Sequence, residues 1–228
     1  MNENTDFNDE YEDEYNGEEL VLEKRTVDPF HSVSMSGIGT LYITQTDSTG
    51  LAVEAHADIL PKIRTSVENG RLKIRLKAFN FLTNPGRINV YANMIEVRRL
   101  GLSGATKIIG RTNISADQLK ISTSGATSFD LEVKVKELKT SLSGSSNGHL
   151  YGAAINHDLR LSGATKVSGF ELGTKKTDVR ASGAALIEIF ADSDLNCRLS
   201  GAAKVRLRGD PKISSLKTSG AAKLERTP

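Results

Sequence analysis

The sequence of 228 residues has few of the side chains that usually build a large globular core. It has no tryptophan, and aromatic residues make up only 5% of it. A conventional two-layer domain of this length is usually richer in large apolar side chains. The single cysteine, Cys197, excludes an internal disulfide framework. No apolar run approaches the roughly 18–20 residues that a membrane-spanning helix needs, so we do not expect an integral membrane protein.

Charge is unevenly distributed, although the formal net charge is only +2. Residues 1–19 contain nine acidic side chains and no basic one, whereas the rest of the chain holds 30 basic and 19 acidic residues, a net charge of +11. A segment this acidic, without aliphatic periodicity, cannot bury enough apolar surface to offset the entropy of ordering it. We therefore expect a disordered acidic tail over 1–19. It would serve either as a solvated leader or as a tether behind a lipidated cysteine.

A short motif, Ser-Gly followed by a small residue, recurs seven times after residue 100. The spacings between successive serines are 18–21 residues, so a unit of about 19 residues repeats to the end of the sequence. The serines of the motif are Ser103, Ser124, Ser143, Ser162, Ser182, Ser200 and Ser219.

Aligning the units on the serine reveals columns of mostly apolar residues. The positions three before, one before and five after the serine are largely aliphatic, and polar residues lie between them. This alternation has a period of two, which indicates strands on both sides of the motif. Glycine permits a positive φ where the chain turns a corner. The column three before the serine contains Leu100, Ile121, Thr140, Leu159, Val179, Cys197 and Leu216.

One unit cannot fold alone, because ordering about 19 residues costs more than burying about five aliphatic side chains returns. Stacked units solve this problem when equivalent strands pair in parallel about 4.8 Å apart. We therefore predict an all-β fold in which residues 100–228 form about seven coils of a parallel β-helix. A propeller is disfavoured because its blades need about 40 residues, and a leucine-rich repeat is disfavoured because no helical pattern lies between the strands.

Residues 20–99 are less regular but also favour strands, which we expect over 31–45, 51–55, 71–76 and 87–91. Asn69-Gly70 is a hairpin signal, residues 84–86 (Asn-Pro-Gly) indicate a turn, and residues 58–63 suggest a short helical or irregular turn. We expect this segment to begin the solenoid and to cap its first coil, so that 20–228 form one continuous domain.

The Ser-Gly-Ala-(Thr/Ala)-Lys-aliphatic units, together with segments such as Gly70-Arg-Leu-Lys-Ile, resemble the putative auto-transporter adhesin, head GIN domain family of Bacteroidetes over about residues 27–225. The resemblance implies a single-stranded, right-handed, pectin-lyase-like β-helix. It also implies export to the periplasm or cell surface, often as a lipoprotein, so a membrane tether through an N-terminal lipid anchor is expected. It implies no established reaction.

Residue types that could support catalysis or bind metal are present but poorly arranged. Residues 144–148 match the Gly-x-Ser-x-Gly motif of hydrolase nucleophiles, which requires a turn between a strand and a helix. Here the motif occupies the same position in the repeat as the other Ser-Gly corners, and no helical pattern follows it. The four histidines lack metal-ligand spacing, and Cys197 falls in an apolar column. Asp158, Asp178, Asp192 and Asp194 do not form the carboxylate cluster of a calcium-dependent lyase. We therefore predict no catalytic residues, no metal site, no cofactor and no enzyme activity.

Two columns of basic residues are a more specific candidate for a functional surface than the residues considered above. In a stacked solenoid they would form cationic tracks for an anionic polymer such as acidic polysaccharide, or simply solvated faces. Nucleic acid is not expected, because no aromatic stacking platform accompanies them. Two positions before the serine lie Arg160, Arg180, Arg198 and Lys217, and four positions after it lie Lys107, Lys166, Lys204 and Lys223.

These features favour an exported cell-envelope β-helix with an adhesin-like or scaffold role and a glycan or envelope-protein partner. Two alternatives stay open: a carbohydrate-active lyase or hydrolase on the same solenoid, and a protein-binding accessory of an envelope regulatory system. The last motif lies close to the end of the sequence, so we also expect a homodimer formed through an uncovered C-terminal coil.

Overall fold

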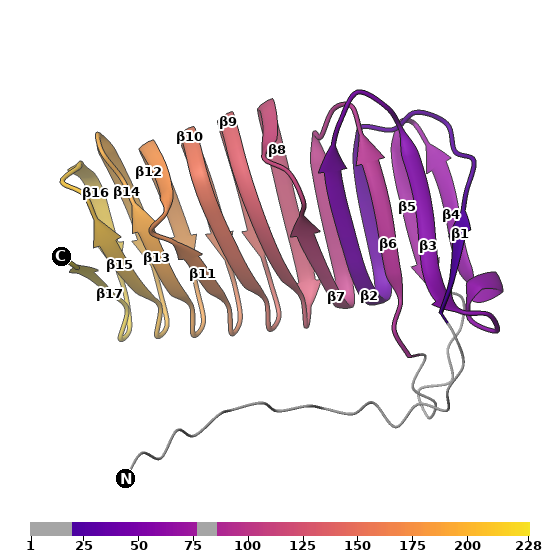
Figure 1. The fold of residues 1–228 in the computed structure, drawn as a ribbon. Coiled ribbons are helices and arrows are strands. Elements are labelled where there is room, and N and C mark those ends of the chain that lie inside the picture. Colours follow the sequence, from indigo (N-terminus) through magenta and orange to yellow (C-terminus); the bar gives the residue numbers. More distant parts are fainter. Residues whose placement is uncertain (1–19, 77–85) are drawn as a thin grey trace, which may run out of the picture.

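The computed structural model describes residues 20–76 and 86–228, which form a β-solenoid of about seven turns with a less regular N-terminal part (Figure 1). The predicted acidic tail, and Asn84 and Pro85 of the predicted turn, lie outside the described residues. The N-terminal part contains β1 (Leu20–Lys24), β2 (Ser32–Gln45), β3 (Gly50–His56), the 3₁₀ helix η1 (Leu60–Lys62), β4 (Ile63–Glu68), β5 (Arg71–Leu76) and β6 (Asn89–Met94).

The repeat region follows the predicted period of one unit per coil. Its strands pair in parallel with those one unit away, so that Leu100 lies level with Ile121, and Val179 with Cys197. The predicted parallel β-helix is therefore confirmed. The strands are β7 (Arg99–Gly110), β8 (Ile114–Gly125), β9 (Ser128–Leu142), β10 (Asn147–Leu161), β11 (Lys166–Gly169), β12 (Leu172–Ala181), β13 (Leu186–Phe190), β14 (Asp194–Leu199), β15 (Lys204–Arg208), β16 (Lys212–Thr218) and β17 (Lys223–Arg226).

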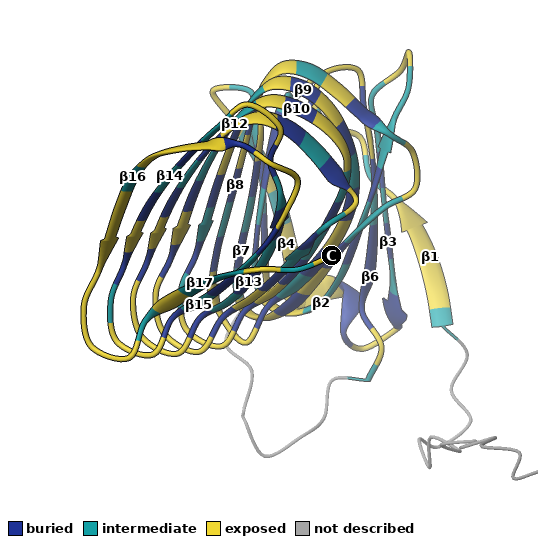
Figure 2. Cartoon of the chain, turned by 90° about the vertical axis from the view of Figure 1, so that its left-hand side faces the viewer, coloured by how far each residue is buried: buried dark blue, intermediate teal, exposed yellow. Residues whose placement is uncertain are grey.

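The aliphatic columns line the inside of the tube, where Figure 2 shows buried and exposed residues alternating along the strands. In the column three before the serine, every side chain from Leu100 to Cys197 is buried. The column five after the serine contains one glycine, Gly148, in register with Phe129. A Cβ at Gly148 would lie 2.2 Å from the Phe129 ring, so the large ring occupies the space that the missing side chain leaves.

The Ser-Gly motifs form the corners, and they bring successive coils too close together for a side chain. At Gly163 φ is +87°, and a Cβ there would lie 2.6 Å from the carbonyl oxygen of Gly144 on the previous coil. That oxygen accepts a hydrogen bond from the backbone N–H of Ala164 at 2.9 Å. Glycine is therefore needed here both for its backbone conformation and for the approach of neighbouring coils.

The N-terminal part extends the stack but also departs from it. β2 pairs in parallel with β7, whereas β1 and β6 each pair antiparallel with β3. The Asn69-Gly70 turn joins β4 and β5 in an antiparallel hairpin, as its sequence predicts, and both turn residues have positive φ. Strand β4 was not predicted, because its apolar residues Ile63 and Val67 are too few to indicate alternation.

The last coil is more exposed than the others. On β16 the side chains of Ile213 and Leu216 are 36% and 47% exposed, although both continue columns that are buried in the preceding coils. Strands β16 and β17 form the C-terminal end of the stack (Figure 1), and Ile213 and Leu216 are the apolar residues exposed on β16. Within residues 20–76 and 86–228, no helix has the length and apolar character required to cross a membrane.

Candidate cationic groove

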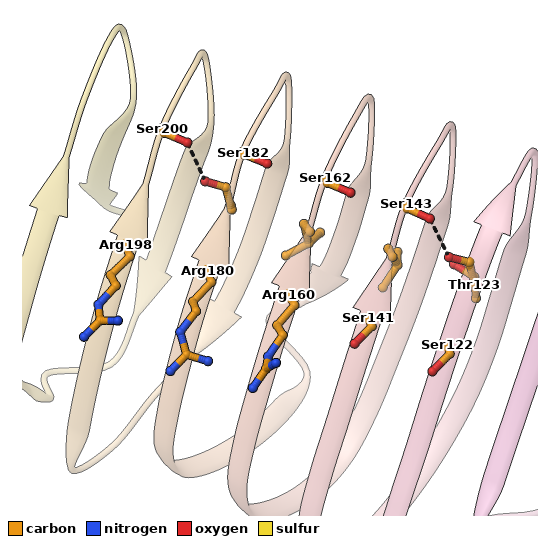
Figure 3. Close-up of a pocket in the computed structure, with 13 residues that line it drawn as sticks. Ser122, Thr123, Ser141, Ser143, Arg160, Ser162, Arg180, Ser182, Arg198 and Ser200 are labelled. Atoms are coloured by element: carbon orange, nitrogen blue, oxygen red, sulfur yellow. Dashed lines mark hydrogen bonds between the residues drawn. The ribbon is translucent and has the colours of Figure 1, made fainter.

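Four of the predicted basic residues lie level with one another on one outer face of the solenoid. Parallel register aligns Arg160 of β10 with Arg180 of β12, Arg180 with Arg198 of β14, and Arg198 with Lys217 of β16. Their side chains point outward because the residues on either side of each one in the repeat belong to the inward columns. Figure 3 shows the three arginines projecting side by side. We call Arg160, Arg180, Arg198 and Lys217 the C-terminal ladder.

A shallow groove of about 670 Å³ runs between the C-terminal ladder and the row of corner serines. Its lining includes Arg160, Arg180 and Arg198 together with Ser143, Ser162, Ser182 and Ser200 (Figure 3). Toward the N-terminal coils the arginines give way to Ser122 and Ser141. The groove therefore combines guanidinium donors along one side with small hydroxyl groups along the other, which suits an extended anionic or hydroxyl-rich ligand.

Asp158 partly neutralises the first two members of the C-terminal ladder. Its carboxylate accepts two hydrogen bonds from Arg160, at 2.7 and 3.2 Å, and lies 3.5 Å from the guanidinium of Arg180. The Arg160 hydrogen bond, with the charges of Arg160 and Arg180, lowers the pKa of Asp158, so this carboxylate is ionised at neutral pH.

The other two members carry no such compensation. Among the described residues, Arg198 and Lys217 form no ion pair, and Asp178, which lies level with Asp158, does not pair with Arg180 or Arg198. Arg198 is consequently the one arginine of the groove's described lining that forms no ion pair. Exposed like charges at the coil spacing repel one another unless solvent or anions screen them.

The second predicted group of lysines is arranged differently. Lys107, Lys166, Lys204 and Lys223 fall in one column, which we call the lysine column, but Ser128, Asn147 and Leu186 occupy the intervening coils. Only Lys204 and Lys223 lie on adjacent coils, and both form ion pairs with Glu225 at 2.7 Å. These two hydrogen-bonded lysines lower the pKa of Glu225 to about 2. The lysine column is therefore interrupted at its centre and neutralised at its end.

Three other cations share the face of the C-terminal ladder and were not singled out from the sequence. Arg99 of β7, Lys120 of β8 and Lys139 of β9 lie level with one another. Each stands four residues before its serine, so alignment of the repeat could have revealed them.

The motif that resembles a hydrolase nucleophile is part of the buried interior. Its central serine, Ser146, is fully buried, donates a hydrogen bond to the carbonyl oxygen of Ser143 at 2.7 Å, and lies 2.9 Å from the hydroxyl of Thr127. Cys197 is also fully buried, as its column predicts, and burial raises the pKa of its thiol to about 12. A protonated, enclosed thiol is not a nucleophile at neutral pH.

The histidines occupy unrelated environments. His157 is buried, with its Nε2 atom 3.1 Å from the hydroxyl of Thr140, and burial lowers its pKa to about 4. His149 is partly exposed, with its Nδ1 atom 3.2 Å from Asp130 and its Nε2 atom 3.7 Å from Glu171. In the described part of the chain, no three His, Cys, Asp or Glu side chains are placed to hold a metal ion together.

Comparison with known proteins agrees with the fold and the repeat. Residues 29–211 match the family described as "Putative auto-transporter adhesin, head GIN domain". The chain belongs to this head GIN domain family. Membership supports an adhesin-like role, and it confirms the resemblance carried by the Ser-Gly-Ala units. The comparison with curated proteins gives no match.

Solved structures from the Bacteroidetes share the fold of this head GIN domain at low sequence identity. A putative adhesin from Bacteroides fragilis is similar with a TM-score of 0.86 and 18% identity, covering 92% of this chain and 97% of that one. A putative lipid binding protein from Parabacteroides distasonis has a TM-score of 0.75 and 18% identity, with coverages of 93% and 98%. A putative adhesin from Parabacteroides merdae has a TM-score of 0.65 at the same identity and coverages.

Proposed function

We propose that this protein is an exported, adhesin-like component of the cell envelope that binds acidic polysaccharide along the C-terminal ladder. The observation that carries the proposal is the alignment of Arg160, Arg180, Arg198 and Lys217 on four successive coils beside a groove. Guanidinium groups recognise carboxylate and sulfate groups through paired N–H donors, and a row of them suits a polymer with regularly spaced anions. Family membership supports export and an adhesive rather than a catalytic role.

Replacing Arg160, Arg180 and Arg198 together by glutamine should weaken binding of polygalacturonate or a sulfated glycan at least tenfold, because three charge-assisted contacts are lost. Isothermal titration calorimetry at two salt concentrations would measure this loss. The wild-type affinity should fall steeply with salt and the variant's affinity should fall less steeply, since fewer counterions are released.

The matched control removes the same charge from the lysine column, through Lys107→Gln, Lys166→Gln and Lys223→Gln. This variant should bind as the wild type does. Equal losses in the two triple variants would mean that only net charge matters, and absence of binding to every acidic glycan would overturn the proposal. Release of shortened or unsaturated products from the same glycans would instead favour the carbohydrate-active enzyme.

We also propose that two copies associate through the C-terminal coil. The support is the exposed apolar pair on β16, Ile213 and Leu216, at the end of an otherwise buried column. Sedimentation velocity should show a concentration-dependent dimer that Leu216→Asp abolishes, because a charge would be desolvated in the contact. Leu22→Asp, at an equally exposed leucine on β1, should leave the dimer unchanged. A wild-type monomer at high concentration would contradict this.

A further inference from the structure

The face that carries the C-terminal ladder has a second row of cations in its earlier coils. Arg99, Lys120 and Lys139, which we call the N-terminal ladder, are exposed and lie level with one another on β7, β8 and β9. They line a groove of about 690 Å³ that also includes Arg71 and Arg98. This groove lies beside the first three coils of the repeat, where the C-terminal ladder has no members.

The acidic residues in the groove of the N-terminal ladder each contact a side chain outside that ladder. Glu96 is held by Arg98 through two contacts of 2.7 Å, Asp117 pairs with Lys136 at 2.8 Å, and Glu137 accepts a hydrogen bond from Asn156. In the described part of the chain, no ion pair is formed by Arg99, Lys120 or Lys139. Three exposed cations are therefore available to an anionic ligand.

The two ladders complement each other coil by coil. Lys139 lies level with Asp158, whereas Arg160 stands two residues farther along its strand, a displacement of roughly 7 Å. On β7, β8 and β9 the N-terminal ladder supplies the cations. On these strands the column that continues the C-terminal ladder contains Gly101, Ser122 and Ser141 instead. Within these two columns, each of the seven coils therefore presents one cation, in a row that changes column once, between β9 and β10.

The groove of the C-terminal ladder continues along the corners toward the earlier coils. The groove of the C-terminal ladder shares Ser122 and Thr123 with a further groove of about 370 Å³, whose lining continues through Ser103 and Gly101 to Ser34. Small side chains thus follow the corners past the change of column.

We propose that one linear acidic polysaccharide occupies both ladders, crossing from one column to the other and placing about one anionic group over each coil. This inference rests on the proposed function and extends it to a ligand footprint. From Arg99 to Lys217 the row covers six coil steps, or about 29 Å. The coil spacing is close to the length of one sugar in an extended glycan, so carboxylates on successive sugars would meet successive cations. A single-stranded nucleic acid fits less well, because no Phe or Tyr lines the three grooves.

The test uses galacturonate oligomers of about four and about seven sugars, which match the C-terminal ladder alone and both ladders together at one sugar per coil. The wild type should bind the longer oligomer about tenfold or more tightly than the shorter one. A variant with Arg99→Gln, Lys120→Gln and Lys139→Gln should lose this length-dependent gain while keeping the wild-type affinity for the shorter oligomer. Its salt dependence with the longer oligomer should be correspondingly less steep.

The outcomes separate the two proposals. If the longer oligomer gains nothing, or if the variant of the N-terminal ladder keeps the full gain, this inference is overturned while the C-terminal ladder can still bind. If the lysine-column triple variant loses the gain equally, the effect is one of net charge and the inference also fails. If neither oligomer binds the wild type, the proposed function itself fails. Thermal melting should be unchanged, because all three residues are exposed.

Discussion

Replacing Gly163 by alanine should lower the free energy of unfolding by at least about 2 kcal/mol. The backbone at Gly163 has a φ of +87°, which is unfavourable for any residue with a Cβ, and the added methyl would lie 2.6 Å from the Gly144 oxygen. Relieving that contact would separate two coils where Ala164 donates its hydrogen bond to the same oxygen. Urea denaturation of the wild type and of Gly163→Ala would measure the difference, and the two proteins should have the same m-value.

Gly173 provides the control, because it lies in β12 near the same coils but without a positive φ. Its added Cβ would have only one neighbour, the Gly152 oxygen at 3.7 Å, an ordinary van der Waals distance. Gly173→Ala should therefore change stability by less than about 1 kcal/mol in either direction. A change in Gly163→Ala as small as that expected for Gly173→Ala would show that the corners tolerate a side chain, and would remove the reason for glycine at every repeat.

The second large effect is a dependence of stability on pH that originates at His157. Burial lowers the pKa of this imidazole in the folded protein to about 4, below the ordinary value of 6.5. The unfolded chain therefore binds a proton more readily than the folded one, and stability falls as pH decreases from about 6.5 to about 4. A shift of this size corresponds to about 3 kcal/mol lost across that window.

The carboxylates with lowered pKa values act at lower pH. Asp158 and Glu225 stabilise the folded state above their unfolded pKa values, and their contributions are lost progressively as pH falls below about 5. His157→Leu, which matches the leucines Leu138 and Leu195 in its column, should therefore flatten the stability profile between pH 6.5 and 4. His149→Gln should retain the wild-type slope. A His157→Leu variant with that same slope would assign the effect to other groups. Chemical denaturation at several pH values measures all three proteins.

Much of the repeat region could be predicted because each coil constrains the next. Once the serines are aligned, a period of two assigns the residues next to each motif to the inside or the outside, and parallel pairing places Arg180 level with Arg160. The sequence alone does not reveal that Asp158 bridges both arginines, because that contact depends on side-chain rotamers. The N-terminal ladder was missed for another reason, because its column changes from cations to Asp158, Asp178 and Asn196 halfway along the stack.

The N-terminal part was harder to predict because its strand pairs are not repeated. Alternation indicated strands at 51–55 and 71–76, but nothing local specifies that β3 pairs with both β1 and β6, or that β2 pairs with β7. The hairpin at Asn69 and Gly70 is the exception, because the turn residues themselves determine which strands pair.

The stacking of nearly equivalent coils has a consequence for how such proteins diversify. Because each coil packs only against its two neighbours, duplicating or deleting a genetic segment of one unit changes the length of the rod by about 4.8 Å and leaves the remaining contacts intact. Selection can therefore change the length of the ligand-facing surface by copying units. No new packing arrangement has to evolve.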